Sequence, residues 1–126
     1  MSLYESAEMY LETIYRLSRT APAVRSIDVA QAMGYSRPSV SRAVSLLRKE
    51  GYLEMDADGF LTLTDSGKEI ACKIFDRHTV LTEALVRLGV DRETAAEDAC
   101  RIEHVISDRS FDTIKSHLHR FSPASE

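Results

Sequence analysis

The residues with the clearest chemical potential are a thiol, a carboxylate and an imidazole within five positions of one another. Cys100, Glu103 and His104 have the spacing i, i+3 and i+4, which would place them on one face of a helix. Together they offer a soft, a hard and a borderline metal ligand. Three ligands from one helix face usually need a fourth from elsewhere, so the sequence favours a metal centre that another element completes.

Other interpretations of this cluster have less support in the sequence. Cys100 and His104 could act as a nucleophile and its base, but no oxyanion feature or third orienting residue accompanies them. A closed structural zinc site would require paired Cys and His spacings, which the chain lacks. Cys100 could instead be a small buried apolar side chain, and His78 a hydrogen-bonded residue in the middle of a helix. In that case neither residue would bind a metal or take part in a reaction. An enzyme is therefore not expected.

The composition is that of a globular protein without a membrane segment. Of the 126 residues, 44% are hydrophobic and 29% are charged. No apolar run approaches the ~20 residues that cross a bilayer, and the first residues lack the layout of a signal peptide. A protein with only two cysteines in a reducing compartment is not expected to contain a structural disulfide. These features predict a cytoplasmic protein.

Residues 4–51 carry the signals of three helices. Apolar positions at helical spacing predict the first helix over residues 4–19. Ser26 is a candidate N-cap for a second helix that stops at Gly34. Ser36 is a candidate N-cap for a third helix, which Gly51 ends. The second and third helices, joined by a short turn with glycine, form a helix-turn-helix pattern.

Two short strands and three further helices are predicted after the helix-turn-helix. Residues 52–55 and 60–63 flank a turn that ends in Asp-Gly, so they predict a hairpin. A hairpin in this position is the wing of a winged helix, and residues 1–64 are expected to form a winged-helix DNA-binding domain. The expected fold class is mostly α: an N-terminal winged helix-turn-helix domain followed by an α-helical domain over residues 65–126. The later helices are predicted from a cap at Thr64 to Gly89, from a cap at Asp91 through His104, and from Ser107 or Asp108 to near His119, with a frayed tail over 121–126.

The start of the third helix is the expected DNA-reading surface. The second helix of a helix-turn-helix enters the major groove with its N-terminus first. The net charge of the chain is −4, yet residues 25–50 carry five basic and only two acidic side chains. Two copies would be needed to read half-sites about one helical turn, roughly 34 Å, apart. The candidate DNA-contacting residues are Ser36, Arg37, Pro38, Ser39, Ser41 and Arg42.

The sequence resembles the diphtheria toxin repressor and manganese transport regulator group of metal-dependent repressors. The resemblance covers nearly the whole chain and rests on residues 6–15, on the winged helix, on Arg77-His78 and on residues 97–108. It implies a DNA-binding domain, a helical metal-binding and dimerisation domain over residues 65–126, and a metal bound between them. It also implies a homodimer that binds double-stranded operator DNA, with no membrane and no small-molecule substrate.

Both branches of that group contribute to the ligands that the resemblance implies. The iron-responsive branch uses a methionine, a cysteine, a glutamate and a histidine, which match Met9, Cys100, Glu103 and His104. The manganese branch has Asp in place of Met9 and Glu in place of Cys100. That branch also uses a glutamate and a histidine, which match Glu12 and His78 of this chain. The full set of candidate ligands is Met9, Glu12, His78, Cys100, Glu103 and His104. The ancillary iron-branch site is not expected, because its His and Glu are replaced here by Ala96 and Thr82.

The implied function is a metal-dependent transcriptional regulator that represses metal-uptake genes. Thioether and thiolate ligands favour Fe(II) over Mn(II), whereas carboxylates and imidazole would serve manganese. We therefore expect Fe(II) first and Mn(II) second, with Co, Ni or Zn able to bind in vitro. Three alternatives stay open: a manganese-responsive repressor of the same fold, a winged-helix regulator that senses an organic ligand or thiol oxidation, and a helical protein-interaction module.

Overall fold

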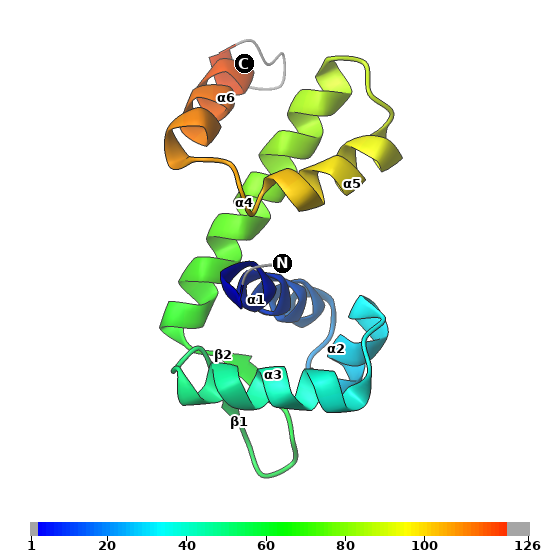
Figure 1. Cartoon of the computed structure of the whole chain (residues 1–126), viewed down its shortest axis with the longest axis vertical. Helices are drawn as coiled ribbons and strands as arrows, with labels where there is room; N and C mark the ends of the chain where they lie inside the picture. The colour runs from blue at the N-terminus through cyan, green and yellow to red at the C-terminus, as the bar shows by residue number, and fades with distance from the viewer. Residues whose placement is uncertain (1–2, 121–126) are drawn as a thin grey trace. The chain divides into compact units, whose positions relative to one another are not determined.

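The computed structural model describes residues 3–120, in which six helices accompany one small antiparallel sheet (Figure 1). The tail predicted over residues 121–126 lies outside the described part. The chain divides into two compact units, residues 1–73 and 74–126, and α4 contributes to both. The expected fold class is confirmed: mostly α, with a winged helix-turn-helix at the N-terminus. The elements are α1 (Leu3–Thr20), α2 (Ser26–Met33), α3 (Arg37–Lys49), β1 (Leu53–Met55), β2 (Leu61–Leu63), α4 (Asp65–Arg87), α5 (Arg92–Ile102) and α6 (Asp108–Arg120).

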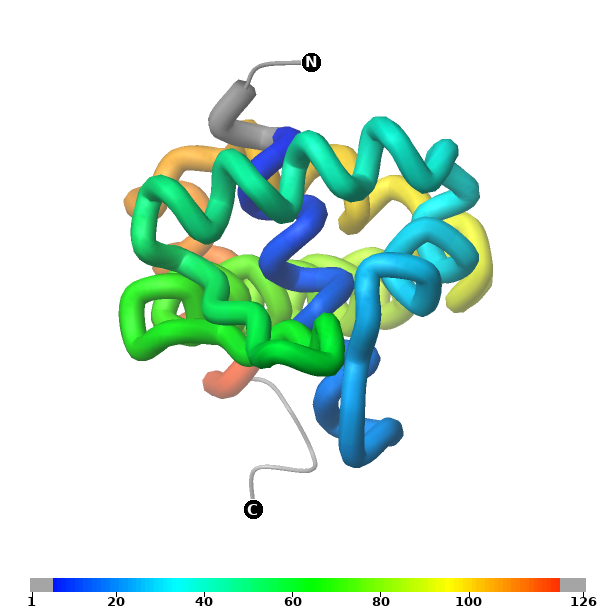
Figure 2. Tube along the Cα trace, turned by 90° about the horizontal axis from the view of Figure 1, so that it is seen from below, coloured from blue at the N-terminus to red at the C-terminus, as the bar shows by residue number. Residues whose placement is uncertain are grey.

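The first unit is built around the apolar face of α1. Leu11 and Ile14 of α1 are buried in one core together with Val29 of α2 and with Val40 and Val44 of α3. Burial of each such side chain contributes about 1.5–3 kcal/mol to the stability of the fold. Residues on α1 are therefore rigidly connected to the helix-turn-helix. Figure 2 shows this unit with α3 and the hairpin toward the reader.

The turn between α2 and α3 follows the predicted signals. Gly34 ends α2 with a left-handed backbone, φ 71°, a conformation that costs glycine little. Ser36 caps α3, and its hydroxyl accepts a hydrogen bond from the Ser39 N–H at 3.3 Å. The N-cap predicted at Ser26 is wrong. Arg25 takes that position instead, because its backbone is extended and pairs with Phe60 while its N–H donates to Asp28.

The hairpin is joined to both of its neighbours in the first unit. Strands β1 and β2 pair antiparallel, with Leu53 opposite Leu63. The N–H of Leu61 also donates to the Val24 carbonyl at 2.7 Å, which attaches the wing to the chain before α2. Thr64 caps α4 as predicted, because its hydroxyl accepts from the Gly67 N–H at 3.2 Å.

The second unit consists of the later part of α4, α5 and α6 around a small apolar core. Val80 and Leu81 of α4 are buried with Ala99 of α5 and Phe111 of α6. Asp91 caps α5 as predicted by accepting from the Thr94 N–H, and this hydrogen bond lowers the pKa of the Asp91 carboxyl. Of the two caps considered for α6, Ser107 is the one observed: its hydroxyl accepts from the Ser110 N–H. Among residues 3–120, no helix is long and apolar enough to cross a membrane.

Candidate metal centre and DNA-binding surface

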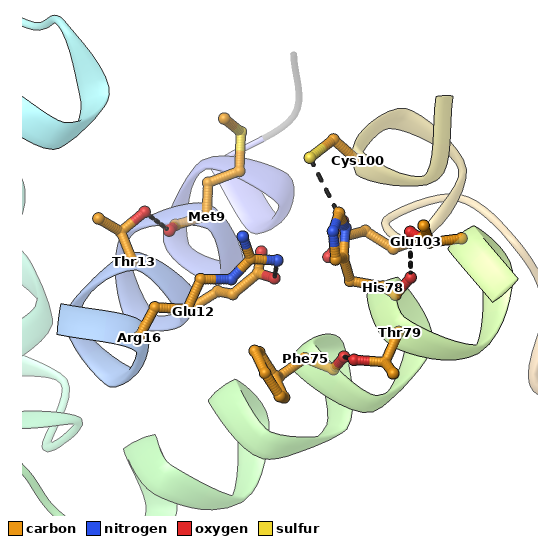
Figure 3. Close-up of polar contacts among 10 residues, drawn as sticks. Met9, Glu12, Thr13, Arg16, Phe75, His78, Thr79, Cys100 and Glu103 are labelled. Carbon is orange, nitrogen blue, oxygen red and sulfur yellow. Dashed lines mark hydrogen bonds and ion pairs between the residues drawn. The ribbon is translucent and has the colours of Figure 1, made fainter. Parts of the chain in front are cut away.

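A thiol, an imidazole and a carboxylate meet in the second unit. The Nδ1 atom of His78, in the middle of α4, lies 3.0 Å from Oε1 of Glu103. The same nitrogen lies 3.7 Å from the Cys100 sulfur, and Figure 3 shows this contact. One ligand atom from each of the three side chains lies within 4.8 Å of the other two. This spacing is compatible with coordination of one cation.

Glu103 is the most unusual member of the cluster because it is a fully buried carboxylate. Its exposed fraction is 0%, and its Oε2 atom has no hydrogen-bond partner among the described residues. A buried charge is costly unless it is paired or coordinates a metal. Cys100 is exposed and His78 is partly buried, so the cluster reaches from the interior to solvent. These donors fit a divalent transition metal.

The backbone around Glu103 and His104 differs from the predicted continuous helix. α5 ends at Ile102, Glu103 is its C-cap, and His104 lies in the following turn. The prediction that α5 carries both ligands is therefore wrong. The reason is that the chain must turn into α6, with the N–H groups of Val105 and Ile106 both donating to the Ile102 carbonyl. A Glu103 carboxylate oxygen and a His104 ring nitrogen still lie within 4.8 Å of each other.

The other two candidate ligands, Met9 and Glu12, lie on α1 of the first unit. They are separated by three positions, so they share a helix face. Glu12 accepts a hydrogen bond from Arg16 at 2.6 Å, and the Met9 carbonyl accepts from Thr13 (Figure 3). The six predicted ligands thus form two sets, four in the second unit and two on α1.

The six candidate DNA-contacting residues form one surface at the start of α3. Five of them are exposed, and Ser39 is partly buried. The Ser36 and Ser39 hydroxyls are hydrogen bonded at 2.9 Å, and Arg42 donates to Ser39 at 3.4 Å. Tyr35, which precedes the cap, packs edge-on against buried Tyr10 of α1. Burial, together with the neighbouring Tyr35, raises the pKa of the Tyr10 hydroxyl.

Comparison with known proteins identifies the family. Residues 2–60 match the N-terminal DNA-binding domain of the iron-dependent repressors, and residues 64–123 match their metal-binding and dimerisation domain. The chain belongs to the iron-dependent repressor family. This is a family of metal-dependent transcriptional regulators and not of enzymes, as predicted from the sequence.

Relatives of this iron-dependent repressor family member are named for both iron and manganese. It is 34% identical over 107 residues to the iron-dependent repressor IdeR of Mycobacterium tuberculosis, covering 84% of this chain but 46% of IdeR. It is 36% identical over 109 residues to the transcriptional regulator MntR of Lysinibacillus sphaericus, covering 86% and 78% of the two chains. A solved manganese-dependent transcriptional repressor complex with manganese superposes with a TM-score of 0.82 at 30% identity, over 89% of this chain and 52% of that one. The chain therefore spans about half the length of some relatives.

The dimerisation domain of this iron-dependent repressor family member has an apolar groove. The groove lies between the C-terminal half of α4, the end of α5 and α6. Leu88, at the end of α4, is 81% exposed there. Other apolar side chains that line the groove are Leu81, Leu85, Ile106, Ile114 and Leu118. An exposed leucine at the edge of an apolar groove makes this face a candidate interface.

One positioning residue, Arg77, is not predicted as part of the site by the sequence pattern. Arg77 is 7% exposed and donates to the carbonyls of Glu103 and Ile106, while it also forms an ion pair with Asp108. In the sequence, Arg77 stands out only as the neighbour of His78 in the family resemblance. These partners lie 26 to 31 positions away, so no local spacing could have revealed them.

Proposed function

We propose that this protein represses metal-uptake genes and binds its operator when a divalent metal occupies the cluster around Glu103. The observation that carries the proposal is the buried Glu103 carboxylate with an unpartnered oxygen beside an imidazole and a thiol. A bound cation supplies the positive charge that this carboxylate lacks. The residues that would hold the metal are Met9, Glu12, His78, Cys100, Glu103 and His104.

We propose Fe(II) as the physiological metal, with Mn(II) second. The Met9 thioether and the Cys100 thiolate are soft donors, which suit iron(II) better than manganese. Glu12, Glu103 and His78 are the ligand types that manganese accepts. Co, Ni and Zn are expected to bind in vitro because raw affinity follows the Irving–Williams order rather than biological use.

The connection from metal to DNA runs through α1. Leu11 and Ile14 embed α1 in the same core as α3, so a constraint on Met9 or Glu12 is also a constraint on the recognition helix. Ligands from α1 and from the second unit would fix the two units in one arrangement. The two recognition helices of a dimer would then need less ordering when they meet DNA. Ser36, Arg37, Pro38, Ser39, Ser41 and Arg42 are the proposed contacts to operator DNA.

The proposal predicts that removing the metal weakens operator binding. We expect an affinity loss of about 5–150-fold on treatment with EDTA, the range of typical allosteric coupling, and recovery on adding Fe(II) under reducing, anaerobic conditions. A gel-shift titration with a selected operator would measure both. Arg42→Ala serves as the control, because losing an arginine on the DNA surface should weaken binding with and without metal alike. Equal affinity of the wild type with and without EDTA would refute the mechanism.

We further propose that a second copy of the chain covers the apolar groove. Leu88→Glu is expected to convert the dimer to a monomer at micromolar concentration without destabilising the monomer, because this side chain is exposed in the single chain. Each lost Leu burial costs about 1.5–3 kcal/mol, and a two-fold interface loses it twice. Val105→Glu is the matched control, since Val105 is 70% exposed and does not line the groove. Analytical ultracentrifugation would measure both, and a Leu88→Glu protein that remains dimeric would place the interface elsewhere.

A further inference from the structure

A buried arginine lies directly before His78 in the second unit. Arg77 is 7% exposed, and its guanidinium carbon lies 5.4 Å from the centre of the Phe111 ring. A buried cation of this kind needs anionic or carbonyl partners, since desolvating it is costly. Its hydrogen-bond and ion-pair partners all lie within residues 103–108, the segment that also contains His104.

The guanidinium reaches both ends of the turn between α5 and α6. Its Nη1 donates to the Glu103 carbonyl at 3.1 Å and to the Ile106 carbonyl at 2.8 Å. Its Nη2 donates to the Asp108 carboxylate, in the first turn of α6. One side chain of α4 therefore ties together the end of one helix, the turn itself and the start of the next helix.

The chemistry of these contacts requires an arginine. The last carbonyls of a helix are acceptors that have no N–H donor within the helix, and they carry the negative end of its dipole. A planar guanidinium offers five donors in a fixed fork, so it can satisfy two carbonyls and a carboxylate at once. A lysine would keep the charge but could not hold the same three acceptors in one geometry.

We infer that Arg77 is a positioning residue for the metal centre, which deepens the proposed function and rests on it. Glu103 and His104 sit in a turn that contains no proline to restrict its backbone. Within that turn, Arg77 holds the carbonyl of Glu103 itself. Metal–ligand distances in proteins fall within about 0.2 Å of characteristic values, so a backbone that is already held near this geometry needs less ordering when the metal binds. Arg77 fixes it.

A second ion pair makes it possible to distinguish positioning of the metal centre from general stabilisation of the packing between α4 and α6. Lys115 of α6 donates to Asp76 of α4 at 2.7 Å, so it joins the same two helices as Arg77 and Asp108 do. No described hydrogen bond of Lys115 reaches the turn over residues 103–107. If Arg77 only braced the helices, removing either pair would have a similar effect on the metal centre.

The test is a Co(II) titration of the purified, reduced dimer. Arg77→Lys is expected to weaken Co(II) binding by roughly 10–100-fold, the usual effect of removing an outer-shell partner. The d–d and thiolate-to-cobalt absorption bands should also change, because Cys100, Glu103 and His104 would be held less uniformly. Lys115→Gln should keep the wild-type affinity and spectrum. Circular dichroism of each metal-free protein confirms that it is folded.

Two results would overturn the inference. One is a folded Arg77→Lys protein with wild-type Co(II) affinity and spectrum, and the other is a Lys115→Gln protein with an equal loss. If Arg77→Lys does not fold, Asp108→Asn takes its place in the Co(II) titration. This substitution removes the ion pair with Arg77 but leaves both carbonyl contacts of the guanidinium possible. Unchanged affinity in that variant would also refute the role. Failure of the proposed function is distinguishable, because it would show in the wild type itself, either as no Co(II) binding or as operator binding that EDTA leaves unchanged.

Discussion

Replacing Glu103 with glutamine is expected to abolish tight metal binding while leaving the metal-free protein at least as stable as the wild type. Glu103 is fully buried, and one of its oxygens has no partner among the described residues. Burying an ion costs on the order of several kcal/mol, and glutamine has the same shape without the charge. The same substitution removes the anionic oxygens that a hard or borderline cation requires. Stability and metal binding should therefore respond in opposite directions.

The Glu103→Gln prediction can be measured by thermal unfolding with and without metal. The loss of metal affinity should exceed the roughly 10–100-fold that an outer-shell change causes, so Co(II) should no longer raise the unfolding temperature. Glu97→Gln is the matched control: Glu97 is an exposed carboxylate on α5, the helix that Glu103 caps, and its variant should respond to Co(II) as the wild type does. A Glu103→Gln protein that retains Co(II) stabilisation would remove this carboxylate from the proposed ligand set.

Local signals in the sequence account for most of the winged helix. Gly34 readily adopts the left-handed backbone that ends α2, and Ser36 offers a side-chain acceptor to α3, so each signal acts on groups within a few residues. The caps at Thr64 and Asp91 were predictable for the same reason. Arg25 was missed as the N-cap of α2 because its conformation depends on pairing with Phe60, which is 35 positions away.

The candidate metal centre depends on contacts between residues that are far apart in the sequence. The spacing of Cys100, Glu103 and His104 indicated metal ligation, but it also suggested a helix that in fact ends at Ile102. The turn that follows this helix is held by Arg77, whose hydrogen bonds to the Glu103 and Ile106 carbonyls are long-range. Only the family resemblance indicates His78 as a ligand. In the structure it contacts Glu103, which is 25 positions away in the sequence. Side chains that meet only through tertiary packing leave no periodic trace in one sequence.

Replacing Met9 with aspartate is expected to shift metal preference from iron(II) toward manganese(II). Met9 is the proposed soft ligand on α1, and aspartate is a hard oxygen donor of the kind that manganese prefers. Met9 is only half-buried, so the substitution should not disrupt the core formed by Leu11 and Ile14. We expect the ratio of Mn(II) to Fe(II) affinity to rise by on the order of tenfold, which corresponds to about 1.4 kcal/mol.

The Met9→Asp prediction depends on α1 contributing a ligand, so its control must separate ligation from packing. Met9→Leu keeps an apolar side chain of similar size and removes only the sulfur. If Met9 binds the metal, Met9→Leu should weaken Fe(II) binding without improving Mn(II) binding, whereas Met9→Asp should improve Mn(II) binding in absolute terms. Anaerobic competition titrations with a chromogenic chelator would give both constants. Unchanged selectivity in Met9→Asp would exclude Met9 as a ligand, and α1 would then have to be constrained through Glu12 alone.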